Sequence, residues 1–96
     1  EDSFWSAEDK DDYLTVTLGK NVPLKSLVVH WHSGSIKRYN YKILVSEDGN
    51  GWTEVKSGKN SEMTETVDMS QFSGKYIRII GTDGRLAIDD VQVYTK

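Results

Sequence analysis

The stretch that most constrains the fold is residues 39–55, which has the pattern of two β-strands joined by a tight turn. Apolar residues recur at every second position before the turn, the period of a half-buried strand. These are Tyr39, Tyr41, Ile43 and Val45. Residues 47–51, Glu-Asp-Gly-Asn-Gly, contain two dipeptides that favour hairpin turns, and Trp52 starts a return strand. The stretch predicts a central hairpin whose two aromatic ends anchor a β-sandwich core.

Further β-prone runs lie on both sides of this hairpin. The expected strands are residues 13–18, 24–32, 64–67, 75–80 and 86–94. Asn21 and Pro23, after Gly19, predict a turn between the first two, and residues 69–72 predict another. There is no convincing helical window, internal repeat or linker. About seven short, evenly spaced strands predict an all-β, antiparallel β-sandwich or jelly roll.

Size and composition indicate how such a sandwich is filled. The 96 residues suffice for one domain, residues 1–96, with a single small core. Only 36% of residues are hydrophobic, so large rings must supply much of the buried area. The rings expected in the core rather than at a ligand are Trp5, Tyr13, Trp31 and Trp52.

Several classes of function find little support. The net charge is −3 without a basic stripe, which argues against a nucleic-acid partner. Cysteine is absent, so there is no thiol nucleophile or disulfide. No apolar run approaches the ~20 residues of a membrane span, and there is no signal peptide. Common catalytic motifs are missing. Carboxylate pairs that converge in space stay open, although a chain this short has little room for a deep cleft. We expect no enzyme.

Six short motifs follow one another in an order that resembles the discoidin-like, coagulation-factor type C sandwich, and within it the family 32 carbohydrate-binding modules. They are Trp5-Ser6-Ala7, residues 13–19 ending in Thr-Leu-Gly, Leu27-Val28-Val29-His30-Trp31, Ser46-Glu47-Asp48-Gly49 with Trp52, Lys75-Tyr76-Ile77-Arg78-Ile79, and Ile88-Asp89-Asp90-Val91-Gln92-Val93-Tyr94. The Trp-x-x-Gly of Trp31 and Gly34, followed by basic residues and an aromatic strand, is most similar to modules attached to bacterial polysaccharide lyases, including alginate lyases.

One departure from the family pattern lies at the start of the sequence. Family members usually carry a first strand and an Asp-Gly loop before the segment that contains Trp5. Here the sequence starts almost at that segment. We expect either a fragment of a larger multidomain enzyme or a discoidin-like fold that lacks the first strand.

The resemblance implies a structural calcium ion near the first loop. The matching positions are Asp2, Ser3 and Asp90, and calcium takes six to eight oxygen ligands. The Asp-Gly loop that would complete the site is missing. The alternative is that Asp89 and Asp90 are ordinary acids at the start of a strand.

Sugar binding needs an aromatic plane for the C–H face of a pyranose and donors for its hydroxyl or carboxylate groups. We expect three loops at one end of the sandwich to supply them. The candidates are Phe4, His32, Lys37, Arg38, Tyr39 and Arg85. Lys37 and Arg38 match the basic position of the family, and arginine binds carboxylates through a fork of donors. The alternative is that Lys37 and Arg38 only solubilise a loop while Tyr39 packs inward with Tyr41.

Three other features have structural explanations. His30 and His32 lie on one strand face and suit a transition metal, but no third ligand is evident and His30 is an equally good cross-strand partner. Residues 47–50 lack the acid spacing of an EF-hand and form a turn. We expect Arg78 to lie along the sheet and pair with an acid.

Together these features predict a non-catalytic carbohydrate-binding module, secreted by a bacterium, that holds an appended polysaccharide-degrading domain at its substrate. The expected ligand is an acidic polysaccharide or oligosaccharide such as alginate, because Lys37, Arg38 and Arg85 gather near one rim. The alternative is a structural domain that packs against a catalytic neighbour without binding glycan. A phospholipid binder would need exposed apolar spikes, and only Phe4 and Leu86 qualify.

Overall fold

The computed structural model describes residues 5–7, 13–32, 39–59, 63–82 and 86–96, with only the backbone at 5–7 and 86. This part of the chain forms seven β-strands. They are β1 (Trp5–Ala7), β2 (Tyr13–Trp31), β3 (Asn40–Ser46), β4 (Thr53–Lys59), β5 (Thr64–Asp68), β6 (Ser73–Gly81) and β7 (Leu86–Thr95). The described segments contain no helix that is long and apolar enough to cross a membrane.

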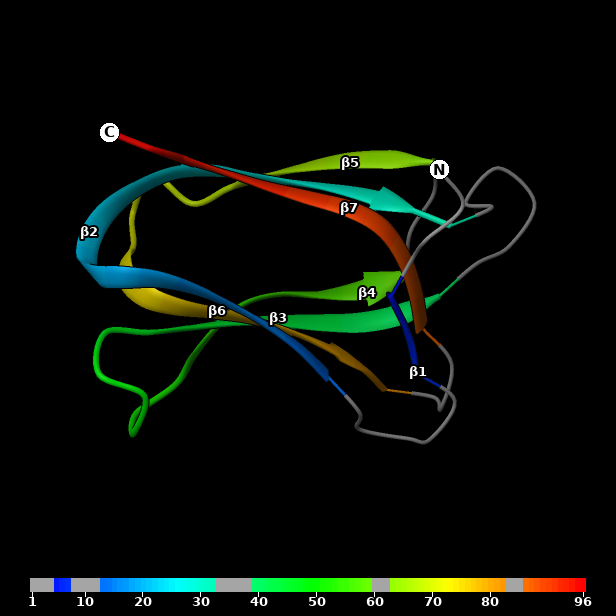
Figure 1. Ribbon diagram of the computed structural model, residues 1–96, viewed down its shortest axis with the longest axis horizontal. Coiled ribbons are helices and arrows are strands. Elements are labelled where there is room, and N and C mark those ends of the chain that lie inside the picture. Colours follow the sequence, from blue (N-terminus) through cyan, green and yellow to red (C-terminus); the bar gives the residue numbers. More distant parts are fainter. Residues whose placement is uncertain (1–4, 8–12, 33–38, 60–62, 83–85) are drawn as a thin grey trace.

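The strands form one curled antiparallel sheet in the order β1-β7-β2-β6-β3-β4, with β5 also paired to β2. Figure 1 shows the result as two facing layers. The upper layer in Figure 1 contains β5, β7 and the second half of β2. The lower layer contains the first half of β2 with β6, β3 and β4. The prediction of an all-β antiparallel sandwich is confirmed.

Strand β2 belongs to both layers, and here the predicted turn is wrong. The sequence suggested two strands separated at Gly19, Asn21 and Pro23, but β2 runs unbroken for 19 residues. The chain bends instead of reversing, because bulges take up the extra residues: the register with β6 shifts between Thr17 and Val22. Gly19 supplies the positive φ of 87° that this bend needs.

The remaining strands follow the predicted order. The turn at residues 69–72 closes with a hydrogen bond from Phe72 N to Met69 O at 2.9 Å. Strand β1, which sequence reasoning missed, pairs with β7 so that Trp5 lies opposite Ile88. Three residues are too few to show a period, so a strand this short leaves no readable pattern.

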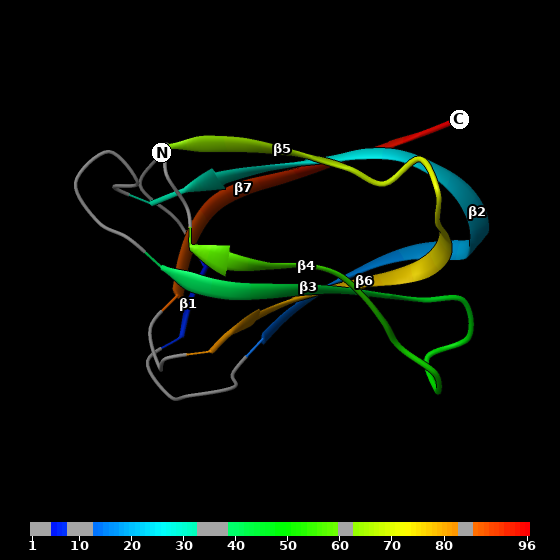
Figure 2. The ribbon, with the colours of Figure 1, turned by 180° about the vertical axis from the view of Figure 1, so that it is seen from behind.

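The core lies between the two layers and comes from alternate positions of the strands. In β3 every second residue, Tyr41, Ile43 and Val45, is a buried apolar residue. Ile77 and Ile79 of the neighbouring strand β6 lie beside them on the same side of the sheet. The other buried apolar residues are Leu24, Leu27, Val29, Trp31, Tyr39, Val67, Met69, Ala87 and Ile88. The view from behind in Figure 2 shows both layers closing over this space.

The predicted hairpin is confirmed as β3, a loop at residues 47–52, and β4. Its central position is not, because β4 lies at the edge of the sheet, and Trp52, expected in the core, is only partly buried and lies outside it. Gly49 has a φ of 88°, and the Asp48 carboxylate accepts hydrogen bonds from Asn50 N (2.8 Å) and Gly51 N (3.2 Å). These two backbone donors, Asn50 first, lower the pKa of Asp48 below its ordinary value. The loop and the β5–β6 turn lie at the same end of the sandwich (Figures 1 and 2).

Candidate functional site

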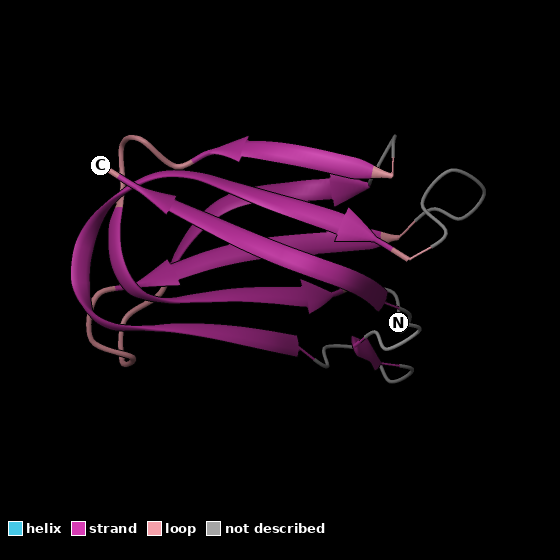
Figure 3. Ribbon diagram, turned by 45° about the horizontal axis from the view of Figure 1, so that its top comes forward, coloured by secondary structure: helices cyan, strands magenta, loops and turns pink. Residues whose placement is uncertain are grey.

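The opposite end of the sandwich brings together the borders of the predicted binding loops. His32 N donates to Ala87 O at 3.0 Å, and Thr82 N donates to Asn40 O at 3.1 Å. These residues border segments 33–38 and 83–85. The β1–β7 pair adds Trp5, which follows segment 1–4. The borders of all three segments therefore meet at one end of the sandwich, on the right of Figure 1 and of Figure 3. We call this end the rim.

Most of the predicted site residues lie outside the described part of the chain. They are the ligand candidates Phe4, Lys37, Arg38 and Arg85 and the calcium candidates Asp2 and Ser3. Their roles stay predictions. The described candidates are His32, Tyr39 and Asp90.

His32 lies at this end with its side chain partly open to solvent. Its Nδ1 atom is 2.9 Å from Asp89 Oδ1, and the two side chains are 35% and 45% exposed. The contact gives Asp89 the role of orienting an imidazole ring at the rim. The ring of His32 is thus held beside Asp89 at the end of the sandwich where the loop borders meet.

Tyr39 corrects the sequence interpretation, because its ring packs inward. The side chain is only 2% exposed and stacks on Trp31 with ring centroids 5.8 Å apart. Its hydroxyl donates to His32 O at 2.5 Å. The expectation that Tyr39 offers a stacking plane is wrong, and the packing alternative describes it. Tyr39 instead ties together the two residues that border segment 33–38.

A buried layer of rings supports this end from below. Trp31 and Tyr41, each 1% exposed, have ring centroids 5.0 Å apart, and Trp31 Nε1 donates to Glu65 Oε1 at 3.1 Å. The Tyr41 hydroxyl has no hydrogen-bond partner of acceptable geometry in the described chain. Burial, and then the nearby negative charge of Glu65, raise the pKa of Tyr41 far above its ordinary value. The base of the site is therefore rigid, and the Tyr41 phenol stays neutral.

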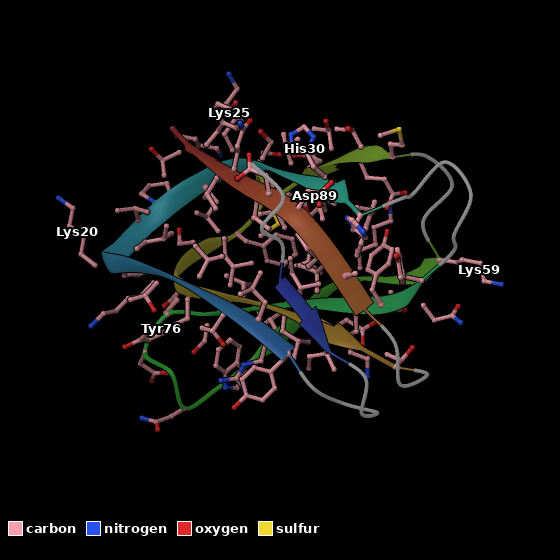
Figure 4. All side chains as sticks on the ribbon, turned by 45° about the vertical axis from the view of Figure 1, so that its right-hand side comes forward. Lys20, Lys25, His30, Lys59, Tyr76 and Asp89 are labelled. Carbon is pink, nitrogen blue, oxygen red and sulfur yellow. The ribbon has the colours of Figure 1, made fainter. Side chains whose placement is uncertain are left out.

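The histidines and acids of the upper layer pair with their neighbours. His30 Nδ1 is 3.0 Å from Thr64 Oγ1, and His30 lies opposite Asp90 in the β2–β7 register. The cross-strand interpretation of His30 is confirmed. Asp90 is exposed and accepts from Gln92 Nε2 at 3.3 Å. No metal-binding group of three side chains occurs in the described segments, and the calcium prediction is untested. Figure 4 labels His30 and Asp89 on this layer.

Arg78 corrects a second interpretation. No acid pairs with it in the described chain; its guanidinium carbon lies 4.0 Å from the Tyr13 ring centroid and 4.2 Å from that of Trp52. Tyr13, expected in the core, is 49% exposed on the outside of the lower layer. We refer to Tyr13, Arg78 and Trp52 as the Arg78 stack. Sequence reasoning missed it because the three residues come from distant parts of the chain.

A hollow of about 430 Å³ lies at the hairpin end. Its lining combines aromatic, hydroxyl, amide and acidic side chains. The residues are Val45, Glu47, Asp48, Gly51, Trp52, Thr53, Gln71, Phe72 and Ser73. The two carboxylates make this hollow unfavourable for an acidic ligand, because like charges repel.

Residues 1–89 match the F5/8 type C domain, so the chain belongs to that family. No curated protein matches the chain in a sequence search. The family assignment and the fold confirm the discoidin-like resemblance.

Solved structures of carbohydrate-binding modules, two of them named as CBM32, share the fold. The CBM32 of AlyQ, solved in complex with 4,5-unsaturated mannuronic acid, has a TM-score of 0.84 at 24% identity and covers 96% of this chain and 77% of its own. CpGH89CBM32-6 of Clostridium perfringens has a TM-score of 0.84 at 15% identity, covering 99% and 78%. A pectin-binding module has a TM-score of 0.82 at 19% identity, covering 95% and 70%.

Proposed function

We propose that this chain is a non-catalytic carbohydrate-binding module, secreted by a bacterium, that holds an appended enzyme on an acidic polysaccharide such as alginate. Three things support the proposal: membership of the F5/8 type C family, a fold shared with carbohydrate-binding modules, and the arrangement of the rim. Truncated AlyQ carries a CBM32 and an alginate lyase domain in one chain, and this chain covers 27% of it.

The observation that carries the proposal is the convergence of loop borders at one end. The His32–Ala87 and Asn40–Thr82 hydrogen bonds hold the borders of segments 33–38 and 83–85 side by side. Those segments contain Lys37, Arg38 and Arg85. Cationic side chains gathered near one rim favour a ligand with carboxylate groups, which arginine binds through paired donors.

The electrostatics of the two ends support the same choice of ligand. The hollow at the hairpin end carries Glu47 and Asp48, so a sugar that carries a carboxylate, a uronate, gains nothing there. At the rim, the Asp89 carboxylate is engaged by a hydrogen bond with the His32 ring within the protein. The proposed uronate site is therefore the rim rather than the hollow at the hairpin end.

Such a module raises the activity of its neighbour without any chemistry of its own. Binding one site on a polymer keeps a linked catalytic domain at a high effective concentration of substrate, and modest affinity per module is enough. The rim needs only preorganised hydrogen-bond donors and a supporting layer beneath them. The rings of Trp31, Tyr39 and Tyr41 supply the supporting layer.

The test is calorimetric titration of the chain with tetramannuronate, a four-residue acidic oligosaccharide. We expect the double variant Lys37→Ala and Arg38→Ala to bind at least about tenfold more weakly, because a hydrogen bond to a charged group contributes ~1.5–3 kcal/mol. The matched control is Lys20→Ala with Lys25→Ala, which removes the same charge from exposed positions of β2 (Figure 4) and should bind normally.

Undiminished binding by the rim double variant would defeat the proposed site. No measurable heat with acidic and neutral oligosaccharides would favour the alternative, a structural domain that packs on a catalytic neighbour. The same titration with and without a chelator tests the calcium proposal, for which Asp90→Asn is the matching variant. Calcium that neither changes binding nor raises the melting temperature would remove it.

A further inference from the structure

We propose that the Arg78 stack, on the outer face of the lower layer, is a second binding site for the carboxylate of an acidic sugar. It lies on the outward side of the sheet rather than on the loops at the rim. The proposal shares only the ligand class with the proposed function. Either site can exist without the other.

The stack places the guanidinium carbon of Arg78 over two rings, about equally far from each. Arg78 lies in the middle of β6 and points away from the core, between Tyr13 at the start of β2 and Trp52 just before β4. Nε donates to Thr15 Oγ1 at 3.2 Å. The two ring contacts and the hydrogen bond restrain the guanidinium group. Arg78 therefore loses little further side-chain freedom when a ligand binds to the edge of its guanidinium group.

The outer edge of this guanidinium has unused donors. Arginine has five N–H groups, and the hydrogen bond to Thr15 uses one of them. Within the described residues, no carboxylate lies within ion-pair distance of Arg78. The fork formed by the two terminal nitrogens matches the two oxygens of a carboxylate, the arrangement that gives arginine its strong paired contacts.

The neighbouring charges favour an anion at this position. Glu54, which lies across Leu44 from Arg78 in the sheet register, is 3.7 Å from Lys42, which offsets its charge. A second cation, Lys75, lies 5.5 Å from the centroid of the Tyr76 ring, and that ring is 6.4 Å from Trp52. The stack thus continues as a row of rings with a further ammonium group. Figure 4 labels Tyr76 on this side of the molecule.

The exposed ring identifies the rest of the ligand. Tyr13 is 49% exposed, so the residue remains partly open to solvent while the guanidinium lies over its ring. A pyranose can place its C–H face on such a ring while its carboxylate reaches the fork of Arg78. A polymer of uronates offers this pair of groups at every residue. The occupant that fits both features is a polyuronate segment.

The stack itself contributes little stability, which makes the site testable by substitution. Exposed cation–π contacts contribute about 0.5–1 kcal/mol each. Arg78→Lys keeps the positive charge but loses the planar fork, so the folded sheet is retained while paired carboxylate binding is lost. Lys25→Gln is the matched control, because it removes one positive charge from an exposed position of β2 in the other layer and leaves the stack and Lys75 intact.

The experiment is a titration of the ¹⁵N-labelled chain with tetramannuronate, followed by proton–nitrogen correlation spectra. We expect the Trp52 indole and Arg78 Nε–H signals to shift, and the Asn40 and Thr82 amides to report the rim separately. In Arg78→Lys the Trp52 shift should require at least about tenfold more ligand while the rim amides respond as before. In Lys25→Gln both groups of signals should respond.

Other outcomes overturn the second site. Unmoved Trp52 and Arg78 signals remove it, and shifted rim amides in the same spectra leave the proposed function standing. Equal Trp52 shifts with a neutral mannose tetrasaccharide would mean ring stacking without carboxylate recognition. Shifts with a poly-glutamate peptide but not with tetramannuronate would assign the surface to an acidic protein partner.

Discussion

The packing around Gly74 leaves no room for a side chain. It is buried in β6, and a Cβ atom there would overlap Val45 Cγ2 and lie 3.4 Å from Ser46 O. We predict that Gly74→Ala lowers the free energy of unfolding by about 1–3 kcal/mol, the usual cost of overpacking a core. Urea denaturation measures it. Gly51→Ala is the control, since a Cβ there meets no atom within 4 Å; equal stability of the two variants would refute the packing argument.

Asp48 makes the stability of the hairpin loop depend on pH. Hydrogen bonds from Asn50 N and Gly51 N lower its pKa below the ordinary 3.8. The folded state therefore favours the ionised form, and its contribution is complete above pH 3.8 and lost as the pH falls through the lower folded-state pKa. We predict that Asp48→Ala is less stable than the natural chain at pH 7 and that the gap narrows below pH 3.8.

Urea denaturation at pH 7 and at several values below pH 3.8 measures this gap. The control is Glu47→Ala, which removes a neighbouring exposed acid that makes no hydrogen bond in the described chain. A gap that stays constant with pH would mean that the Asp48 carboxylate acts by shape rather than by charge.

At single residues, strand alternation proved a better guide than residue type. Trp31 and Tyr41 were assigned to the core by alternation, and both are buried. Tyr39 shares the phase of Tyr41 and is buried too, although its place beside a basic segment suggested a binding role. Tyr13 shares the outward phase of Thr15, and its aromatic character alone suggested the core. In both cases the prediction gave more weight to the chemistry of the residue than to its position in the alternation of the strand.

At the scale of elements, β2 shows why one strand was taken for two. Its inward residues fall at even positions such as Leu14 and Val16 and at odd positions such as Leu27 and Val29. A change of phase together with Gly19 and Pro23 normally marks a turn. The register shifts of β2 against its partners absorb the change, and only the pairing of neighbouring strands reveals this.

The bend of β2 predicts an unusual sensitivity at Gly19. A residue with a Cβ atom costs about 1–2 kcal/mol in the left-handed region. We therefore expect Gly19→Val to lower the free energy of unfolding by about that amount, although no atom lies within 4 Å of an added Cβ. Gly19→Asn is the control, because asparagine tolerates a positive φ. Thermal or urea unfolding compares them; equal losses would mean that the bend does not depend on backbone freedom.

At the scale of the whole molecule, the sequence was sufficient for the architecture and for the location of the rim. Antiparallel strands of similar length place alternate connections at the same end, so the borders of segments 33–38 and 83–85 could be expected to meet. The Arg78 stack could not be expected. It depends on β2 lying beside β6 and on Trp52, just before β4, reaching Arg78 across the sheet, which follows from the fold and not from any motif.

Strand β2, which belongs to both layers, also limits where residues can be inserted into or deleted from this chain. Between Leu24 and Leu27, both fully buried, β2 shifts its register by one residue against β7. A single-codon deletion there would swap the inward and outward side chains of one half while the other half kept its own. Insertions and deletions during divergence should therefore spare residues 13–31 and accumulate in surface connections, where added length leaves the alternation of every strand intact.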